Sequence, residues 1–210
     1  MVLVKVCGIT NLDDALAAAD AGADALGFNF YQRSPRYVTP ETARPIVDRL
    51  QADYPNLLNV GVFVNESLEA IKRIAAAAGV SALQLHGNET PEYCKALQGY
   101  HLIKVFSASD KFVPQTVLDY EVQAIMLDAV DKEAFGGTGK VGNWAVARET
   151  RELVPKLFLA GGLSADNVAD AIREVNPFAV DACSRLESAP GHKDQTRVRA
   201  FVAAVRAATA

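Results

Sequence analysis

The sequence predicts an α/β fold, a (β/α)8 barrel formed by residues 1–210 as a single domain. Short β-rich runs alternate with helix-like segments along the 210 residues, and several runs, such as VLVKVC and AIMLD, are almost continuously apolar. Such runs are typical of parallel strands that are buried on both faces. No Gly-x-Gly-x-x-Gly turn follows the first strand, and polar residues recur at strand ends. Both observations favour a closed barrel over an open doubly wound sheet.

Eight strands are expected from these apolar runs. They span Leu3–Cys7, Ala25–Asn29, Asn59–Val64, Ala82–Leu85, Leu102–Val105, Ala124–Asp128, Lys156–Ala160 and Ala179–Asp181. Because the carboxyl ends of barrel strands meet at one rim, the side chains at these ends are the first candidates for a functional site.

The segments between the strands are predicted as helices from capping residues and apolar spacing. The expected helices are Asn11–Ala21 capped by Thr10, a helix that begins at Thr39-Pro40-Glu41, Glu66–Ala78 with Gly79 as its stop, a helix around Val113–Tyr120, Ala165–Val175 capped by Ser164, and Asp194–Ala208. These segments supply the outer layer of the predicted barrel.

Composition and charge exclude several classes of function. The formal net charge is −4 at pH 7 and the sequence pI is about 5.4, which argues against a general nucleic-acid binder. The apolar run at the N-terminus is short and contains Lys5, so neither a signal peptide nor a membrane span is expected there. The three cysteines and three histidines are scattered, so neither a disulfide framework nor a metal site is expected, and the cytoplasm is the predicted location.

Cys7 closes the first strand and is followed by Gly8. At the rim of a barrel its thiol could act as a base, or it could be a small apolar filler. Lys5 shares its strand face with Cys7. If that face points inward, Lys5 requires a partner, and Asp181 on the adjacent eighth strand is the candidate. The alternative is that Lys5 extends outward to solvent.

Asp128 and Arg36 are the next candidates. Asp128 ends the apolar run AIMLD, where a carboxyl group could act as a general acid or cap a loop or helix. Arg36 lies in the sequence SPRY after the second strand. A proline-stiffened loop would suit an arginine that binds a carboxylate through two hydrogen bonds, although many loop arginines are simply solvated.

Glycines after the seventh strand predict a phosphate site. Gly161 and Gly162 precede a predicted helix, and such glycines expose backbone amides to an anion. After the eighth strand, Ser184 and Arg185 could bind the same phosphate through a hydroxyl group and a guanidinium group.

Two further motifs contain candidate substrate contacts. In LQLHG, Gln84 and His86 share one face at the end of the fourth strand, where His86 could contact substrate, assist proton transfer or be structural. In GGTGK, Gly137 lies in a glycine-rich segment that could form a lid or expose amides to an anion.

These motifs, in this order, resemble those of the phosphoribosylanthranilate isomerase family of tryptophan biosynthesis. The matching stretches are KVCGIT at 5–10, GFNFYQRSPRYV at 27–38, GVFVN at 61–65, LQLHG at 83–87, MLDA at 126–129, GGTGK at 136–140, LAGGLSADNV at 159–168 and VDACSRLESAPGHKD at 180–194. The likeness extends from near the first residue to the last helix.

The resemblance implies a TIM barrel that isomerises N-(5′-phosphoribosyl)anthranilate to 1-(2-carboxyphenylamino)-1-deoxyribulose 5-phosphate by an Amadori rearrangement. It implies no cofactor and no metal. Asp128 would be the general acid, Cys7 the general base, and Arg36 the contact for the substrate carboxylate. Gly161, Gly162 and Ser184 would bind phosphate. A small-molecule phosphosugar is the expected partner, and the chain is expected as a monomer or homodimer.

The chain departs from the family pattern near its C-terminus. Where the family usually has Asp-Val-Ser-Ser-Gly-Val-Glu, this chain has Asp-Ala-Cys-Ser-Arg-Leu-Glu, with Cys183 and Arg185 at the changed positions. Arg185 could strain a loop that needs glycine or could bind the phosphate itself. The phosphate motifs alone would also permit another phosphosugar epimerase or lyase, or a non-catalytic phosphosugar-binding barrel.

Overall fold

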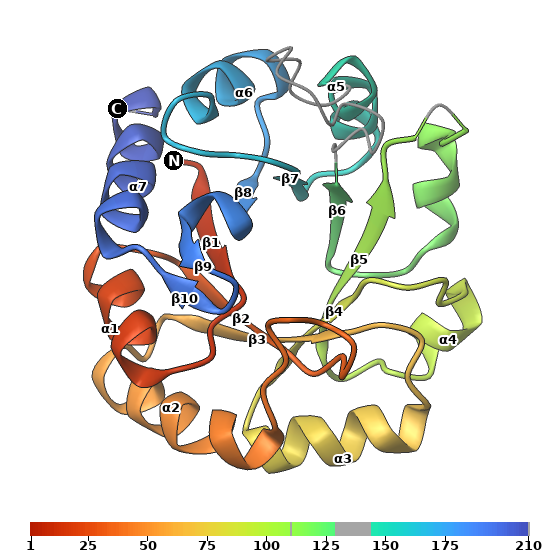
Figure 1. Cartoon of the computed structure of the whole chain (residues 1–210). Coiled ribbons are helices and arrows are strands. Elements are labelled where there is room, and N and C mark those ends of the chain that lie inside the picture. Colours follow the sequence, from red (N-terminus) through yellow and green to blue (C-terminus); the bar gives the residue numbers. More distant parts are fainter. Residues whose placement is uncertain (110, 129–143, 210) are drawn as a thin grey trace.

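Eight parallel strands close into a barrel in the order β1 to β8 (Figure 1). This computed structural model describes residues 1–109, 111–128 and 144–209. The strands are β1 (Leu3–Cys7), β2 (Ala25–Asn29), β3 (Leu58–Phe63), β4 (Ala82–Leu85), β5 (His101–Ser107), β6 (Ala124–Asp128), β7 (Leu157–Ala160) and β8 (Ala179–Ala182). The predicted α/β fold and barrel closure are confirmed, and each strand lies within two residues of its predicted bounds.

Helices surround the barrel and connect most of its strands (Figure 1). They are α1 (Leu12–Asp20), α2 (Pro40–Asp53), α3 (Leu68–Ala78), α4 (Pro91–Lys95), α5 (Trp144–Leu153), α6 (Val168–Val175) and α7 (Gln195–Ala208), with the 3-10 helices η1 (Pro114–Asp119) and η2 (Ser184–Leu186). A short hairpin of β9 (Glu187–Ala189) and β10 (His192–Lys193) precedes α7. The helix expected around Val113–Tyr120 is therefore the 3-10 helix η1.

Two helix ends have the predicted local chemistry. The Thr39 hydroxyl accepts a hydrogen bond from the backbone N–H of Thr42 at the start of α2. Gly79 ends α3 in the left-handed conformation, with φ of 75°. Glycine adopts this conformation without a steric penalty, so the predicted stop of α3 is confirmed.

Two predicted caps were wrong. Asn11, not Thr10, caps α1, because its side-chain oxygen accepts the backbone N–H of Asp14, while the Thr10 hydroxyl donates to the carbonyl of Gly191. Ser164 does not cap α6, which begins only at Val168. Its hydroxyl instead accepts the N–H of Asp166 in the turn that leads to that helix.

The barrel wall separates two apolar clusters. The inner cluster consists of apolar side chains from seven strands, namely Ala25, Val60, Ala82, Ile103, Val105, Ala124, Met126, Phe158, Ala160 and Ala179. Leu3 packs against this cluster. Because side chains alternate across a strand, Lys5 and Cys7 also face the interior. The outer, larger cluster lies between the strands and the helices.

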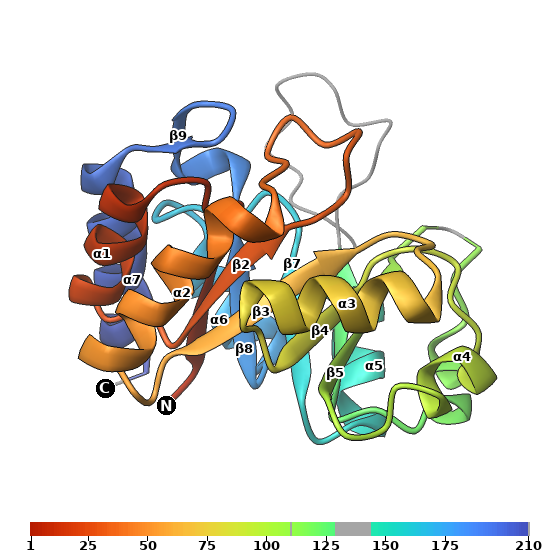
Figure 2. The ribbon, with the colours of Figure 1, turned by 90° about the horizontal axis from the view of Figure 1, so that it is seen from below.

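The loops that follow the strands gather at one end of the barrel. Figure 2 shows the hairpin at β9 and the loop between β2 and α2 at this end, whereas both termini lie at the opposite end. Within the described ranges, no helix is long and apolar enough to cross a membrane.

Candidate active site

The interior of the barrel contains a buried ion pair below Cys7. The Lys5 Nζ atom lies 2.8 Å from Asp181 Oδ1, and Lys5 has no solvent-exposed surface. The two residues are directly opposed in the register between β1 and β8, so the predicted Lys5–Asp181 pair is confirmed. Burial alone would lower the pKa of Lys5, but Asp181 and Cys7 together raise it above its ordinary value. Lys5 is therefore a permanent cation inside the barrel.

Cys7 is buried among groups that favour its thiolate. The neighbouring Cys183 thiol and the Lys5 ammonium outweigh burial and the Asp181 charge, and they lower the pKa of Cys7 from 9.0 to about 6. A thiol with this pKa is largely a thiolate at neutral pH, the form that can accept a proton. The filler interpretation of Cys7 does not account for this environment.

Two glycines allow other groups to approach the thiol. A Cβ atom on Gly27 would lie 2.7 Å from Cys7 Sγ and 3.0 Å from Lys5 Nζ. A Cβ atom on Gly8 would lie 2.7 Å from Arg36 Cδ and 2.9 Å from Cys183 Sγ. Real Cβ atoms essentially never approach another atom to under 3.0 Å, so glycine at both positions keeps space for the cluster around Cys7.

Arg36 is held in place by a carboxylate that the sequence analysis did not select. Its Nε and Nη2 atoms donate to Glu187 Oε1 and Oε2 at 2.8 and 2.5 Å. Glu187 also accepts a hydrogen bond from Lys193 Nζ at 2.9 Å. The side chains of Glu187 and Lys193 are 4% and 0% exposed, so the β9–β10 hairpin anchors the loop that contains Arg36.

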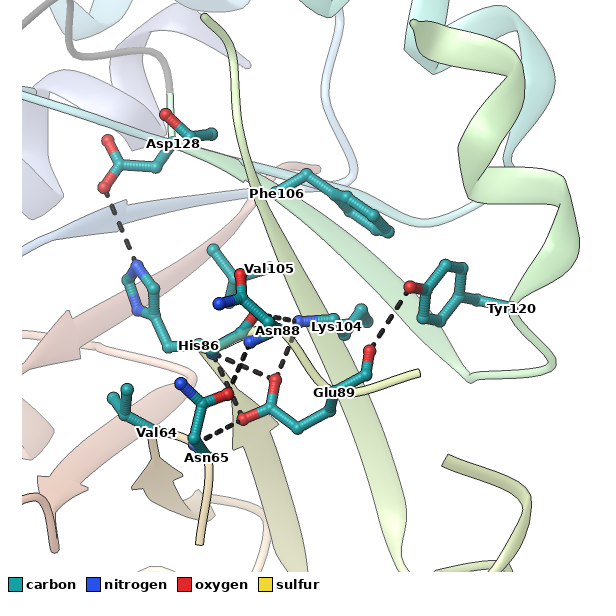
Figure 3. Close-up of a pocket in the computed structure, with 12 residues that line it drawn as sticks. Val64, Asn65, His86, Asn88, Glu89, Lys104, Val105, Phe106, Tyr120 and Asp128 are labelled. Carbon is teal, nitrogen blue, oxygen red and sulfur yellow. Dashed lines mark hydrogen bonds and ion pairs between the residues drawn. The ribbon is translucent and has the colours of Figure 1, made fainter. Parts of the chain in front are cut away.

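Asp128 lies at the end of β6 and faces His86. The distance from His86 Nε2 to Asp128 Oδ2 is 3.9 Å, and both side chains are partly exposed (Figure 3). His86 Nδ1 and Gln84 Nε2 are 3.2 Å apart. One ring nitrogen of His86 therefore faces an amide and the other faces a carboxylate. Burial lowers the pKa of His86 even though Asp128 and Asp181 raise it. The predicted proximity of Gln84 and His86 is confirmed.

A cavity of about 570 Å³ opens beside Asp128 and His86. Phe106 and Tyr120 contribute aromatic surface to it, and Asn65 and Asn88 contribute amides (Figure 3). This volume lies in the range of small-molecule sites, and a mixed aromatic and polar lining is typical of such sites. The cavity therefore provides space for a ligand next to the carboxyl group of Asp128.

The candidate phosphate residues lie at the ends of β7 and β8. Gly161 and Gly162 both have positive φ, 102° and 65°, and a Cβ atom on Gly162 would meet nothing within 4 Å. Ser184 and Arg185 are exposed in η2. Asn65 and Asn176 are the non-glycine residues with positive φ in the described ranges, so Arg185 does not occupy the strained conformation considered above.

The last predictions concern the glycine-rich segment, metal ligands and the cysteines. Gly137 and the rest of GGTGK lie outside the described residues. Among those that are described, no group of three or more His, Cys, Asp or Glu side chains could hold a metal ion. The cysteines Cys7, Cys94 and Cys183 are all free.

Comparisons with known proteins agree over almost the whole chain. Residues 4–204 match the model of the N-(5′-phosphoribosyl)anthranilate (PRA) isomerase family. N-(5′-phosphoribosyl)anthranilate isomerase from Trichlorobacter lovleyi is 45% identical over 202 residues, which cover 96% of this chain and 97% of the relative. The corresponding protein from Thermotoga neapolitana is 47% identical over 203 residues, with coverage of 96% and 97%.

Solved structures show the same similarity. The crystal structure of phosphoribosyl anthranilate isomerase from Thermotoga maritima has a TM-score of 0.90 and 41% identity, and the match covers 99% of this chain and 100% of that one. A phosphoribosyl anthranilate isomerase in complex with reduced 1-(o-carboxyphenylamino)-1-deoxyribulose 5-phosphate has a TM-score of 0.87 and 40% identity, with the same coverage.

Proposed function

Because the chain belongs to the N-(5′-phosphoribosyl)anthranilate isomerase family, we propose that Cys7 and Asp128 perform the two proton transfers of its reaction. The chain is an isomerase of tryptophan biosynthesis that converts N-(5′-phosphoribosyl)anthranilate to 1-(2-carboxyphenylamino)-1-deoxyribulose 5-phosphate. The observation that carries the proposed roles is a buried thiol of low pKa inside the barrel, with a carboxyl group at the same rim.

Asp128 acts first in this proposal. As the general acid it donates a proton to the furanose ring oxygen, and the ring opens to an iminium ion. Its position beside the cavity, next to His86, supports this role. Because a general acid must reach the atom that it protonates, a carboxyl group at the border of a ligand-sized cavity is well placed.

Cys7 acts second, as the general base. The iminium ion acidifies the adjacent C2′–H bond, so a base of moderate strength suffices. The Cys7 thiolate accepts this proton, and the resulting enolamine tautomerises to the ketone product. The pKa of Cys7, about 6, keeps the base deprotonated at neutral pH while it remains basic enough to accept a proton.

Arg36 binds the anthranilate carboxylate in this proposal, although Glu187 already occupies one edge of its guanidinium group. The Nε–H and one Nη2–H point to Glu187. A guanidinium group has five N–H donors. The three remaining donors, on Nη1 and Nη2, form a second edge for a bidentate contact with the substrate. Glu187 would then orient Arg36 rather than compete with the ligand.

Gly161, Gly162, Ser184 and Arg185 are proposed to bind the phosphate group at the ends of β7 and β8. The open space around Gly162 and the exposure of Ser184 and Arg185 support this assignment. Substrate held by both its phosphate and its carboxylate would be oriented across the barrel mouth, which reduces the entropic barrier to reaction. His86 and Gly137, the candidates from the motifs LQLHG and GGTGK, are proposed as further substrate contacts.

The cellular setting is also part of the proposal. Three free cysteines suit a reducing cytoplasm. No cofactor is proposed, so turnover should be unchanged by a chelator. A dimeric phosphoribosylanthranilate isomerase from Thermotoga maritima is known, and this chain is proposed to be a monomer or a homodimer, which its mass in solution would decide.

Turnover of N-(5′-phosphoribosyl)anthranilate by purified variants tests the two catalytic roles. Cys7→Ala and Asp128→Asn should each lower kcat by about 10²–10⁴-fold, the usual contribution of general acid–base catalysis. Cys94→Ala is the matched control, because Cys94 is a buried free cysteine on α4, outside the barrel. A folded Cys7→Ala or Asp128→Asn protein with the wild-type rate would remove that residue from the mechanism.

A further inference from the structure

Cys183 lies beside Cys7, yet the proposed mechanism does not use it. It follows β8 directly, two residues after Asp181, and therefore shares the inward face of that strand. Its sulfur lies 3.9 Å from Glu187 Oε1 and 3.9 Å from Lys193 Nζ. A Cβ atom on Gly8, the neighbour of Cys7, would lie only 2.9 Å from it. In the register between β1 and β8, Val6 lies opposite Ala182, so Cys7 and Cys183, the next residue of each segment, come side by side where the barrel closes.

We propose that Cys183 is a positioning residue whose thiol donates a hydrogen bond to the Cys7 sulfur, so that the two side chains form a thiol–thiolate pair with one proton between them. This inference rests on the proposed role of Cys7 as the general base. Serine is the residue that the related family usually has at this position, and a hydroxyl group could donate in the same way.

The charges around the two sulfurs balance one thiolate. The groups that face the pair are Lys5 and Asp181 from β1 and β8, Arg36 from the loop after β2, and Glu187 and Lys193 from the hairpin. Strand β2, which packs against Cys7, has no titratable side chain. Three cations and two carboxylates leave one positive charge, which a single thiolate neutralises. Two thiolates would be repelled by each other and by both carboxylates.

The proton is expected to reside on Cys183. The Lys5 ammonium, which has donors beyond the one that Asp181 accepts, favours the charge on Cys7. The Glu187 carboxylate accepts a hydrogen bond from the same Cys183 S–H at 3.9 Å and so also favours the protonated form. Lys193, likewise 3.9 Å away, and Arg36 act in the opposite direction but are outweighed. In agreement, the hydrogen bond with Cys7 and burial raise the pKa of Cys183, so that it remains a donor.

The test compares Cys183→Ala, which removes the donor, with Cys183→Ser, which replaces the thiol donor by a hydroxyl donor. The readout is the ultraviolet absorbance of thiolate, titrated from about pH 5 to about pH 8.5, below the ordinary pKa of tyrosine. The wild-type protein should show one step near pH 6. Burial raises the pKa of Cys94, so this third thiol does not contribute to the step.

In Cys183→Ala, the step should move upward by about one to two pH units, because a hydrogen bond to a charged group is lost. In Cys183→Ser it should stay near the wild-type position. Both substitutions remove the sulfur, so a residue that only fills space would give the same result in both. A step that stays near pH 6 in Cys183→Ala, or that survives near pH 6 in Cys7→Ala, would overturn the proposal.

Kinetics separate this inference from the proposed mechanism. If Cys7 is the base, kcat/KM of Cys183→Ala at pH 6 should fall by about 5- to 50-fold, the loss of thiolate for that shift, and should recover near pH 9. Cys183→Ser should remain close to the wild type. If the absorbance step moves and the kinetic profile does not, the hydrogen bond is supported and the base role of Cys7 is rejected.

Discussion

Two buried lysines on opposite sides of the barrel wall show how similar ion pairs can have different roles. Lys5 on β1 points inward and pairs with Asp181 at 2.8 Å. Lys104 on β5 points outward and pairs with Glu89, also at 2.8 Å (Figure 3). The side chains of Lys5 and Lys104 are 0% and 2% exposed. Burial and distance therefore do not distinguish the two pairs.

The distribution of their hydrogen bonds does distinguish them. Lys104 donates to the Leu85 and Gly87 carbonyls and to Glu89, which uses all three protons of its ammonium group. It fastens the segment after β4 to the barrel. Lys5 donates to Asp181 and has protons left for the Cys7 sulfur above it. A buried cation with unused donors can support a reactive anion, whereas one with all donors used is structural.

Substitution of Lys5 should have the largest effect. Lys5→Met leaves Asp181 buried without its cation, which should cost about 3–5 kcal/mol of unfolding free energy. The pKa of Cys7 should rise, and kcat/KM at pH 7 should fall by roughly 2- to 100-fold on top of any unfolding. Chemical denaturation and turnover of the folded fraction measure the two effects.

The double variant Lys5→Met/Asp181→Asn is the control for Lys5→Met. Because it removes both charges, stability should be largely restored, while the loss of kcat/KM should remain. Restored activity in this variant would mean that Lys5 serves only to neutralise Asp181.

Lys104→Met should have a comparable effect on stability and little effect on chemistry. Glu89 would lose its cation inside the protein, at a cost of about 3–5 kcal/mol. Lys104 borders the cavity beside Asp128, so KM can change, but the kcat of the folded fraction should fall much less than in Lys5→Met, because all three Lys104 protons are used by Leu85, Gly87 and Glu89. A drop in kcat as large as that of Lys5→Met would erase the distinction between the two lysines.

The outer pair should also make stability depend on pH. Burial raises the pKa of Glu89, but the hydrogen bond and charge of Lys104, together with backbone N–H donors that include Asn65, outweigh it and lower the pKa below its ordinary value of 4.5. The folded state then binds this proton less readily than the unfolded state does. The contribution of Glu89 is therefore fully present above pH 4.5 and is lost as pH falls through the lower, folded pKa. Denaturation midpoints at neutral and acidic pH, measured in the wild type and in Lys104→Met, should show a smaller acid effect in the variant.

Arg36→Lys should have a moderate effect on binding. Lysine keeps the charge but cannot bridge Glu187 and a substrate carboxylate with two planar edges. KM should rise by about tenfold, the equivalent of one lost hydrogen bond, with a smaller change in kcat. Steady-state kinetics at fixed pH would measure it, and an unchanged KM would reassign Arg36 to a purely structural contact with Glu187.

Arg185→Gly should have the smallest effect. Arg185 is exposed, and exposed charge pairs contribute about 0.2–1 kcal/mol, so KM should rise by about 1.4- to fivefold at low salt and less at high salt. An equal or lower KM would exclude Arg185 from phosphate binding.

The contrast between the two lysines also marks what the sequence could predict. The Lys5–Asp181 pair follows from strand alternation and from closure of the eighth strand onto the first. The Lys104–Glu89 pair does not, because Glu89 lies in an irregular segment whose path depends on tertiary packing. The Arg36–Glu187 contact joins residues 151 positions apart through a hairpin that the alternating pattern did not indicate.

Two details of local structure could not be predicted from the sequence either. Thr10 and Asn11 are both good helix caps, and the Gly191 carbonyl, far away in the chain, accepts the Thr10 hydroxyl and leaves Asn11 to cap α1. The change from serine to cysteine at position 183 was visible in the sequence. Its contact with Cys7 became apparent only with the approach of β8 to β1.

The central claim is that Cys7 and Asp128 act on one ligand from two sides of the barrel mouth. A crystal structure of this chain with a reduced, unreactive analogue of the product tests it most directly. Cys7 Sγ is expected about 3–3.5 Å from C2′, and an Asp128 oxygen within about 3.2 Å of the oxygen that closed the ring in the substrate. An analogue bound in the cavity beside Asp128 but out of reach of Cys7 would contradict the account.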